Sequence, residues 1–192
     1  MRKFLALAAM AVMGASFATA DTLFATLDCT GVDSYDAQGS PNNVAGLIDM
    51  QSVFGNAYTG FTLTGIGWDV DISTVGNSWL SEATVYFDND TLSDGVFLTP
   101  GFNDSFSGSS TYSSGGIVDL VGLGLDINLA PTDMMYLEFF DSFDDNPNAV
   151  DAHWGGTIDL QFEATAVPEP ATMAILGLGV AAVAAKRRRK NA

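Results

Sequence analysis

Residues 157–163 read Thr-Ile-Asp-Leu-Gln-Phe-Glu, which is the pattern of a β-strand. Its apolar side chains alternate with polar ones, so an extended chain here turns one face to a core and the other to water. The same period of two recurs in residues 83–88 and 121–129. Strands with one apolar face each predict an all-β fold, a single antiparallel β-sandwich over residues 21–166.

The stretch 61–72 contains a change of phase. Its apolar residues fall on odd positions at first and on even positions from Ile66 onward, so we expect a β-bulge at Gly65 or Gly67. The predicted core collects the inward-facing side chains of all these strands. Its members are Leu23, Leu27, Leu63, Trp68, Val70, Val85, Phe87, Leu123, Leu125, Ile127, Leu137, Phe139, Ile158, Leu160 and Phe162.

Charge divides the chain into three unlike parts. Of the 23 acidic residues, all except Glu169 lie between Asp21 and Val167, and all seven lysines and arginines lie outside that range. A body without cations does not bind phosphate backbones, so nucleic acid is excluded as a partner. No phosphate-binding loop of the GxxxxGK[ST] type is present either.

Residues 1–20 have the pattern of a secretory signal peptide. Arg2 and Lys3 precede an apolar stretch, and Ala18-Thr19-Ala20 forms a small-residue cleavage pattern that makes Asp21 the expected mature N-terminus. The pattern predicts export across the inner membrane through the Sec translocon. A buried N-terminal helix is the alternative.

The C-terminal end has three parts in order. Val167-Pro168-Glu169-Pro170 is followed by an apolar run over residues 171–185. As a transmembrane helix this run spans about 23 Å, and basic side chains reaching outward cover the difference from a hydrocarbon core of roughly 30 Å. A basic cluster then holds the tail in the cytoplasm and leaves the body outside. This cluster is Lys186, Arg187, Arg188, Arg189 and Lys190.

This order of a proline-flanked glutamate, a short apolar helix and an arginine cluster resembles the PEP-CTERM sorting signal over residues 167–192. The resemblance implies recognition by exosortase, a membrane protease-transpeptidase, with processing near Pro168-Glu169-Pro170. It also implies a transient single-pass intermediate in the inner membrane, then attachment at the cell surface or release into the extracellular matrix. Because such proteins belong to bacteria that make exopolysaccharide and biofilm, exopolysaccharide is an expected partner. A permanently tethered protein with an uncut tail is the alternative.

The later part of the body resembles the jelly-roll P domain attached to subtilisin-like convertases. In that family a strand ending in a small acidic loop precedes a tryptophan and a final alternating strand. Leu137-Glu138-Phe139-Phe140-Asp141 stands in this relation to Trp154 and to Ile158-Asp159-Leu160. The resemblance implies a jelly-roll-like sandwich.

Two acidic loops are candidates for metal binding, because their carboxylates have no lysine or arginine nearby in the sequence. Hard oxygen ligands on a flexible loop suit calcium. The first loop contains Asp88-Asn89-Asp90 and Asp94, but it departs from EF-hand spacing at Leu92 and Ser93. The second loop is the predicted calcium site, with Asp141, Asp144, Asp145 and Asp151 as its ligands. A solvated turn is the alternative for both loops, and no other cofactor is expected.

Catalytic motifs are weak in this sequence. His153 is the single histidine and no serine lies in a GxSxG elbow, so we expect neither a catalytic triad nor a histidine-rich zinc site. Cys29 has no internal partner and falls in phase with apolar neighbours, which predicts burial. We therefore expect a non-catalytic surface or matrix protein, with exposed aromatics such as Trp79 and Tyr112 as candidate sugar contacts. A secreted hydrolase that cleaves polysaccharide with two of the carboxylates is the alternative.

Overall fold

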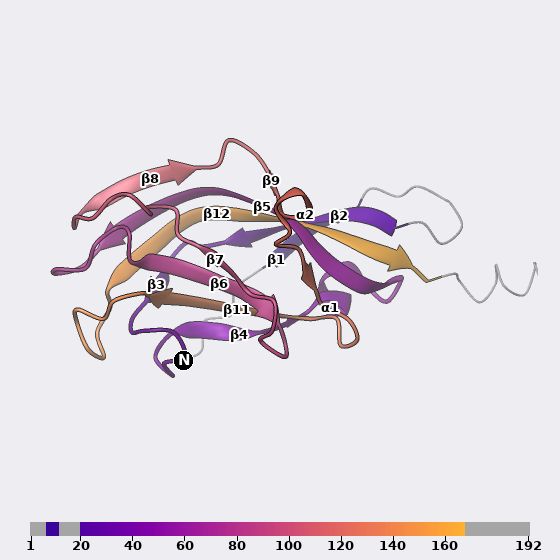
Figure 1. Ribbon diagram of the computed structural model, residues 1–192, viewed down its shortest axis with the longest axis horizontal. Coiled ribbons are helices and arrows are strands. Elements are labelled where there is room, and N and C mark those ends of the chain that lie inside the picture. The colour runs from indigo at the N-terminus through magenta and orange to yellow at the C-terminus, as the bar shows by residue number, and fades with distance from the viewer. Residues whose placement is uncertain (1–6, 12–19, 168–192) are drawn as a thin grey trace, which may run out of the picture.

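The computed structural model describes residues 7–11 and 20–167, which form two antiparallel sheets packed face to face (Figure 1). The larger sheet contains β1 (Leu7–Ala11), β2 (Ala20–Asp28), β3 (Val32–Ser34), β5 (Tyr58–Thr74), β8 (Ser109–Ser113), β9 (Val118–Asp119), β10 (Ile127–Asn128) and β12 (Ala152–Ala166). The smaller sheet contains β4 (Val44–Asp49), β6 (Ala83–Asn89), β7 (Val96–Leu98) and β11 (Met134–Asp141). Two short helices, α1 (Met50–Phe54) and α2 (Leu120–Leu123), lie between strands. The predicted all-β fold with antiparallel sheets is confirmed.

Two long strands form the centre of the larger sheet. β12 pairs with β5 along one edge and with β2 and β3 along the other. The far edge of β5 is covered in turn by β8, β9 and β10. In the smaller sheet the order is β4-β11-β6-β7, so β11 and β6 are central. β12 therefore runs the length of the sandwich, from the loop after β11 to the C-terminal end of the described chain.

The core lies between the two sheets and is built from the alternating side chains that the sequence predicts. Leu160 and Phe162 on β12 are fully buried, and Phe139 on β11 meets the Trp154 ring edge-on at a centroid distance of 5.2 Å. Fully burying one such side chain stabilises the fold by about 2–3 kcal/mol. The free thiol of Cys29 is also buried, as predicted, and burial raises its pKa to about 12.

The change of phase in β5 is a bulge, as predicted. Gln161 of β12 faces Gly65, whereas the next residue, Phe162, faces Leu63, so Thr64 is the extra residue on β5. The bulge thus lies one position before Gly65. Thr64 is nearly buried, and its hydroxyl donates a hydrogen bond of 3.3 Å to the Gln161 carbonyl oxygen.

The strand predicted over residues 121–129 is wrong. Asp119 accepts a hydrogen bond from the Gly122 amide and caps the short helix α2, which Gly124 closes in the left-handed conformation. Only Ile127 and Asn128 are extended, as β10. Two predicted core residues are consequently outside the core: Leu123 is 62% exposed and Leu125 is 45% exposed. A third, Trp68, is half-buried and packs against the edge of the core.

The two ends of the chain are only partly described. Within the predicted signal peptide, Leu7–Ala11 forms β1, which pairs with the outer edge of β2. Signal cleavage before Asp21 would remove β1, and the signal peptide stays a prediction. Among the described residues, no helix is long and apolar enough to cross a membrane. The predicted transmembrane helix over residues 171–185 lies outside the described part of the chain.

Candidate functional site

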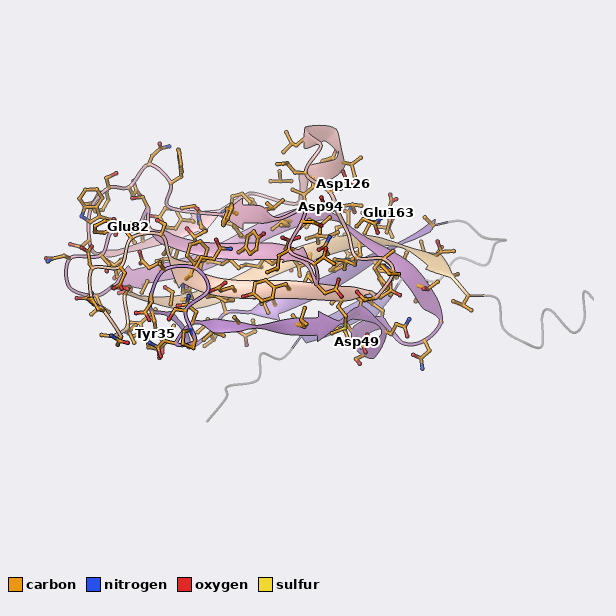
Figure 2. The ribbon with its side chains drawn as sticks, turned by 60° about the horizontal axis from the view of Figure 1, so that its bottom comes forward. Tyr35, Asp49, Glu82, Asp94, Asp126 and Glu163 are labelled. Carbon is orange, nitrogen blue, oxygen red and sulfur yellow. The ribbon has the colours of Figure 1, made fainter. Side chains whose placement is uncertain are left out.

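Five carboxylates from separate segments meet at the end of the sandwich where β11 ends and β12 begins. The inward stripe of β11 runs through Leu137 and Phe139 and ends on Asp141, so this carboxylate points into the end of the core. Strand pairing places Ala83 opposite Asp141, which brings Glu82 beside it. Figure 2 shows Glu82 at that end. We call this group the acidic cluster; it consists of Glu82, Asp141, Asp144, Asp145 and Asp151.

Three carboxylate oxygens of the acidic cluster are buried without any hydrogen-bond partner. Asp141 is fully buried; its Oδ1 accepts from the Phe143 amide at 3.2 Å, but its Oδ2 accepts nothing. Asp151 is also fully buried, and its Oδ2 likewise has no donor. The third oxygen is Oδ1 of Asp144. Since buried polar atoms in folded proteins are nearly always paired, such oxygens call for a partner, which an ordered water, a proton or a bound ion can supply.

The electrostatics of the cluster follow from this burial. Burial, together with the negative charges of Asp151, Glu82 and Asp145, raises the pKa of Asp141 to about 8. Burial also raises the pKa of Asp151 above its usual value, against the lowering effect of its hydrogen bonds. Burial also raises the pKa of Glu82. Burial and mutual repulsion thus favour the protonated form of these carboxyls, and residues 21–167 contain no lysine or arginine to neutralise them.

An open pocket adjoins the acidic cluster. It is lined by Asn77, Trp79, Glu82, Phe143 and Asp145. Trp79 is 44% exposed and Phe143 is 62% exposed, so two aromatic side chains stand beside two carboxylates at the surface. The Trp79 amide donates a hydrogen bond of 2.6 Å to Glu82 Oε2, which fixes that carboxylate at the rim. Sequence reasoning named Trp79 but missed Phe143 and Glu82.

The first acidic loop is built differently. Asp88 is fully buried and accepts hydrogen bonds from the Tyr86 hydroxyl and from the amides of Asn89 and Asp94, the last two at 2.7 and 3.0 Å. Burial and the contact with Asp88 raise the pKa of Tyr86 to about 12. The Asn89 side chain accepts from the Thr91 amide at 2.9 Å and closes the turn. This loop is closed by its own hydrogen bonds around a fully buried carboxylate, whereas the alternative to calcium was a solvated turn.

The ends that carry the predicted sorting residues meet at the opposite end of β12. Val167 is exposed, and its amide donates a hydrogen bond of 2.8 Å to the Ala57 carbonyl oxygen. Ala20 and Asp21 lie in β2, paired with Thr165 and Ala164. The other predicted sorting and cleavage residues lie outside the described residues: Ala18, Pro168, Glu169, Pro170, Lys186, Arg187, Arg188, Arg189 and Lys190.

Comparison with known protein families identifies the segment that follows β12. Residues 166–189 match the PEP-CTERM protein-sorting motif. PEP-CTERM signals are recognised by exosortase, so the chain is an exported protein sorted toward the cell surface or extracellular space through a membrane-associated step. A search of curated proteins returned no match. Nothing in these comparisons supports the resemblance to the convertase P domain, which stays a prediction.

The PEP-CTERM motif and the acidic cluster lie at opposite ends of one strand. Asp151 immediately precedes β12, and the motif begins at the last residue of that strand. The fifteen residues of β12, at about 3.3 Å each, set an upper limit of about 50 Å on this separation, because Gly156 at φ 76° interrupts the extended backbone. Whatever the acidic cluster binds therefore lies far from the site of sorting.

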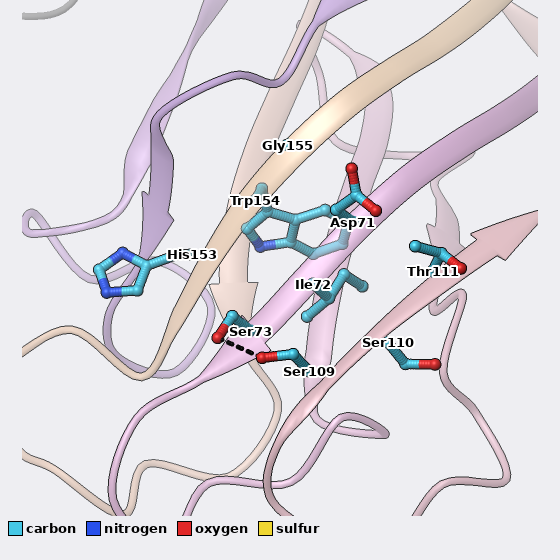
Figure 3. Close-up of a pocket in the computed structure, with 9 residues that line it drawn as sticks. All are labelled: Asp71, Ile72, Ser73, Ser109, Ser110, Thr111, His153, Trp154 and Gly155. Carbon is cyan, nitrogen blue, oxygen red and sulfur yellow. Dashed lines mark hydrogen bonds between the residues drawn. The ribbon is translucent and has the colours of Figure 1, made fainter.

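His153 is placed at the surface beside a second open pocket, over β5, β8 and β12 (Figure 3). Its Nδ1 lies 2.8 Å from Asp33 Oδ1, and within the part of the chain that the structure describes it makes no hydrogen bond to a serine. The nearby hydroxyls of Ser73 and Ser109 instead bond to each other at 2.7 Å, as Figure 3 shows. Three Asp, Glu, His or Cys groups arranged as a ready-made metal centre are not found in residues 7–11 and 20–167.

Proposed function

We propose that the protein is a non-catalytic, exosortase-sorted protein of the cell surface or extracellular matrix, whose acidic β-sandwich associates with exopolysaccharide. One observation carries the proposal: the PEP-CTERM motif begins at residue 166, where β12 ends. Removal of the tail after that point leaves every strand of the body intact. The tail acts as an address, and the body is the delivered part.

The pocket beside the acidic cluster is the proposed contact with polysaccharide. Trp79 and Phe143 expose flat apolar rings of the kind that pack against the faces of sugar rings. Glu82 and Asp145 supply hydrogen-bond acceptors for sugar hydroxyls at the same rim. Because the acidic cluster and the PEP-CTERM motif lie at opposite ends of β12, a body attached through its C-terminal end presents this pocket outward.

Sorting is tested by expressing the full chain in a host that carries an exosortase. We expect the Glu169→Ala variant, and deletion of residues 186–190, to leave unprocessed chain in the membrane fraction. The matched control is Glu163→Ala, which removes an exposed carboxylate from β12 and is expected to be processed normally. Intact-mass measurement of the product decides, because an uncut C-terminus in the unmodified chain would support a permanent tether instead.

Polysaccharide association is tested by co-sedimentation with exopolysaccharide from cells that make it. Trp79→Ala and Phe143→Ala are each expected to weaken binding by about fivefold to tenfold, since each removes one exposed ring from the pocket. Phe24→Ala is the control, because Phe24 is exposed on β2, away from the pocket. Equal losses in all three variants would contradict a specific contact.

A secreted hydrolase is the second candidate, and one observation favours it. Asp141, with a pKa raised to about 8, lies beside other carboxylates near an open pocket, and such pairs serve as acid and base in glycoside hydrolysis. The assay is release of reducing ends from the same exopolysaccharide. Release that is lost in Glu82→Gln or Asp145→Asn would establish catalysis and overturn the non-catalytic proposal.

A further inference from the structure

We propose that the acidic cluster, formed by Glu82, Asp141, Asp144, Asp145 and Asp151, is a binding site for one calcium ion. This inference goes beyond the proposed function, because it holds whether or not the body binds polysaccharide. It rests on the two fully buried aspartates, on their unpaired oxygens, and on the chemistry of the surrounding loop.

The hydrogen-bond donors beside the buried Asp151 carboxylate are already engaged. Oδ1 of Asp151 accepts from the Ser78 hydroxyl at 2.7 Å and from the Asn146 amide group at 2.9 Å. Asn146 directs the same amide group to the Val75 carbonyl oxygen at 3.0 Å. These bonds hold Asp151 in place but leave its Oδ2, and Oδ2 of Asp141, facing no donor.

No side chain between Asp21 and Val167 can neutralise the negative charge of the acidic cluster. No lysine or arginine occurs between Asp21 and Val167, and His153 is exposed and bonded to Asp33. Several buried carboxylates that face one another cannot all stay ionised without a counter-charge. Among the described residues no cation supplies this counter-charge, so we infer that it comes from solution, as a proton or as a metal ion.

Among the buried acidic residues that the structure describes, carboxylate oxygens without a hydrogen-bond donor occur in the acidic cluster alone. Asp133 is nearly buried, and it accepts from the amides of Gly60 and Phe61 at 3.0 and 3.2 Å. Glu138 is also nearly buried, and its Oε1 accepts from the Gly39 amide at 2.7 Å. The fold therefore supplies hydrogen-bond donors to buried carboxylates elsewhere. The absence of a donor at three oxygens of the acidic cluster indicates a ligand.

The type and flexibility of the ligands determine which metal ion the cluster suits. Calcium takes six to eight oxygen ligands in flexible geometry, whereas magnesium requires a compact octahedron and zinc prefers nitrogen and sulfur. Glu82, Asp141 and Asp151 are held at strand ends, while Asp144 and Asp145 lie half-buried on the connecting loop. The carboxylates of the cluster are not placed as a ready-made metal centre, so the loop over residues 142–150 is expected to close on the ion.

The test is a calcium titration of the full-length protein, purified in detergent, stripped with EDTA and dialysed at pH 7.5. Calorimetry over about 10 μM to 10 mM calcium covers the affinity range of extracellular calcium sites. We expect saturable binding of one ion and a rise in melting temperature with calcium. Absence of both would overturn the proposal and leave a proton as the counter-charge, and an equal response to magnesium would overturn the assignment to calcium.

Variants locate the site. Asp141→Asn and Asp145→Asn are each expected to weaken calcium binding by about tenfold or more, since each removes one charged ligand. Asp145 lies on the loop rather than in a strand, so its variant keeps the test decisive if Asp141→Asn fails to fold. The matched control is Asp94→Asn in the first acidic loop, which is expected to bind calcium like the unmodified protein. A similar loss in the control would show diffuse attraction and overturn the proposal.

Discussion

The two acidic loops of this protein begin in the same way and are stabilised in opposite ways. Asp88 and Asp141 are both fully buried near the ends of neighbouring strands, β6 and β11. Asp88 alternates with the core residues Val85 and Phe87 and turns outward, where the amides of its own turn reach it. Asp141 continues the inward stripe of β11, where its Oδ1 accepts one amide hydrogen bond, from Phe143, and its Oδ2 has no donor and other carboxylates lie nearby.

The two loops therefore differ by the direction of the buried side chain and not by their acidic composition. A carboxylate that turns outward at a strand end meets the free amides of the turn that follows. A carboxylate that turns inward at the end of a sandwich meets what the other strands bring there, which in this protein is more negative charge. The predictions below test this distinction.

The largest expected effect is that of Asp88→Ala in the first loop. The change removes the acceptor of three donors, the Tyr86 hydroxyl and the amides of Asn89 and Asp94, in a fully buried place. We expect the free energy of unfolding to fall by about 3 kcal/mol, with a melting temperature about 10 °C lower. Urea denaturation measures it, and an unchanged midpoint would mean that the loop is not self-supporting.

The second expected effect is a dependence of stability on pH in EDTA. Folding raises the pKa of Asp141 to about 8, chiefly through burial and with the charges of Asp151, Glu82 and Asp145. The folded protein therefore holds this proton more tightly than the unfolded chain, and the stability gained is lost as the pH rises from about 5 through 8. Asp28 and Asp36 have lowered pKa values, so they are ionised in both states over this range and add no slope.

The measurement is the melting temperature between pH 5 and pH 8.5, which we expect to fall by several degrees. Saturating calcium is expected to remove most of the fall by stabilising the charged cluster. A melting temperature that rises over this range would contradict the raised pKa values of the cluster.

The third expected effect has the opposite sign to the first. Asp141→Asn in EDTA at pH 7.5 replaces a buried carboxyl, which on folding must either take up a proton or stay charged beside Asp151 and Glu82, by a neutral amide of the same shape. We expect the free energy of unfolding to rise by about 1 kcal/mol, as measured by urea denaturation. Destabilisation in EDTA equal to that of Asp88→Ala would show that the two loops do not differ.

The smallest expected effect is that of Asp94→Asn. The Asp94 side chain is exposed, and its amide, which bonds to Asp88, is unchanged by the substitution. We expect a change within about 0.5 kcal/mol in EDTA or in calcium. A calcium-dependent shift in this variant's melting temperature relative to the unmodified protein would assign a metal role to the first loop after all.

The sequence predicted the strands whose alternation continues across a paired neighbour. Residues 157–163 alternate in β12 as expected, because both of its edges are paired and one face lies on the core. The alternation over residues 121–129 misled because the glycines at positions 122 and 124 give period two without a strand. Asp119 as a helix cap and Gly124 as a left-handed terminator were the signals that would have identified α2.

The candidate site was predicted in part. Asp141, Asp144, Asp145 and Asp151 were named from their spacing, and the structure does bring them together. Glu82 was missed because it comes from the start of β6, and only the pairing of β6 with β11 places it beside Asp141. The spacing of acidic residues in the sequence also made the two loops look alike. Whether turn amides reach a carboxylate depends on the direction of its side chain, which the spacing does not give.

The position of β12 has a mechanical consequence for a protein held by its C-terminal end. Tension applied at Val167 enters the fold along the axis of this strand, which β5 flanks on one edge and β2 on the other. The backbone hydrogen bonds along both edges of β12 are then loaded in shear. They must therefore break together and not one at a time.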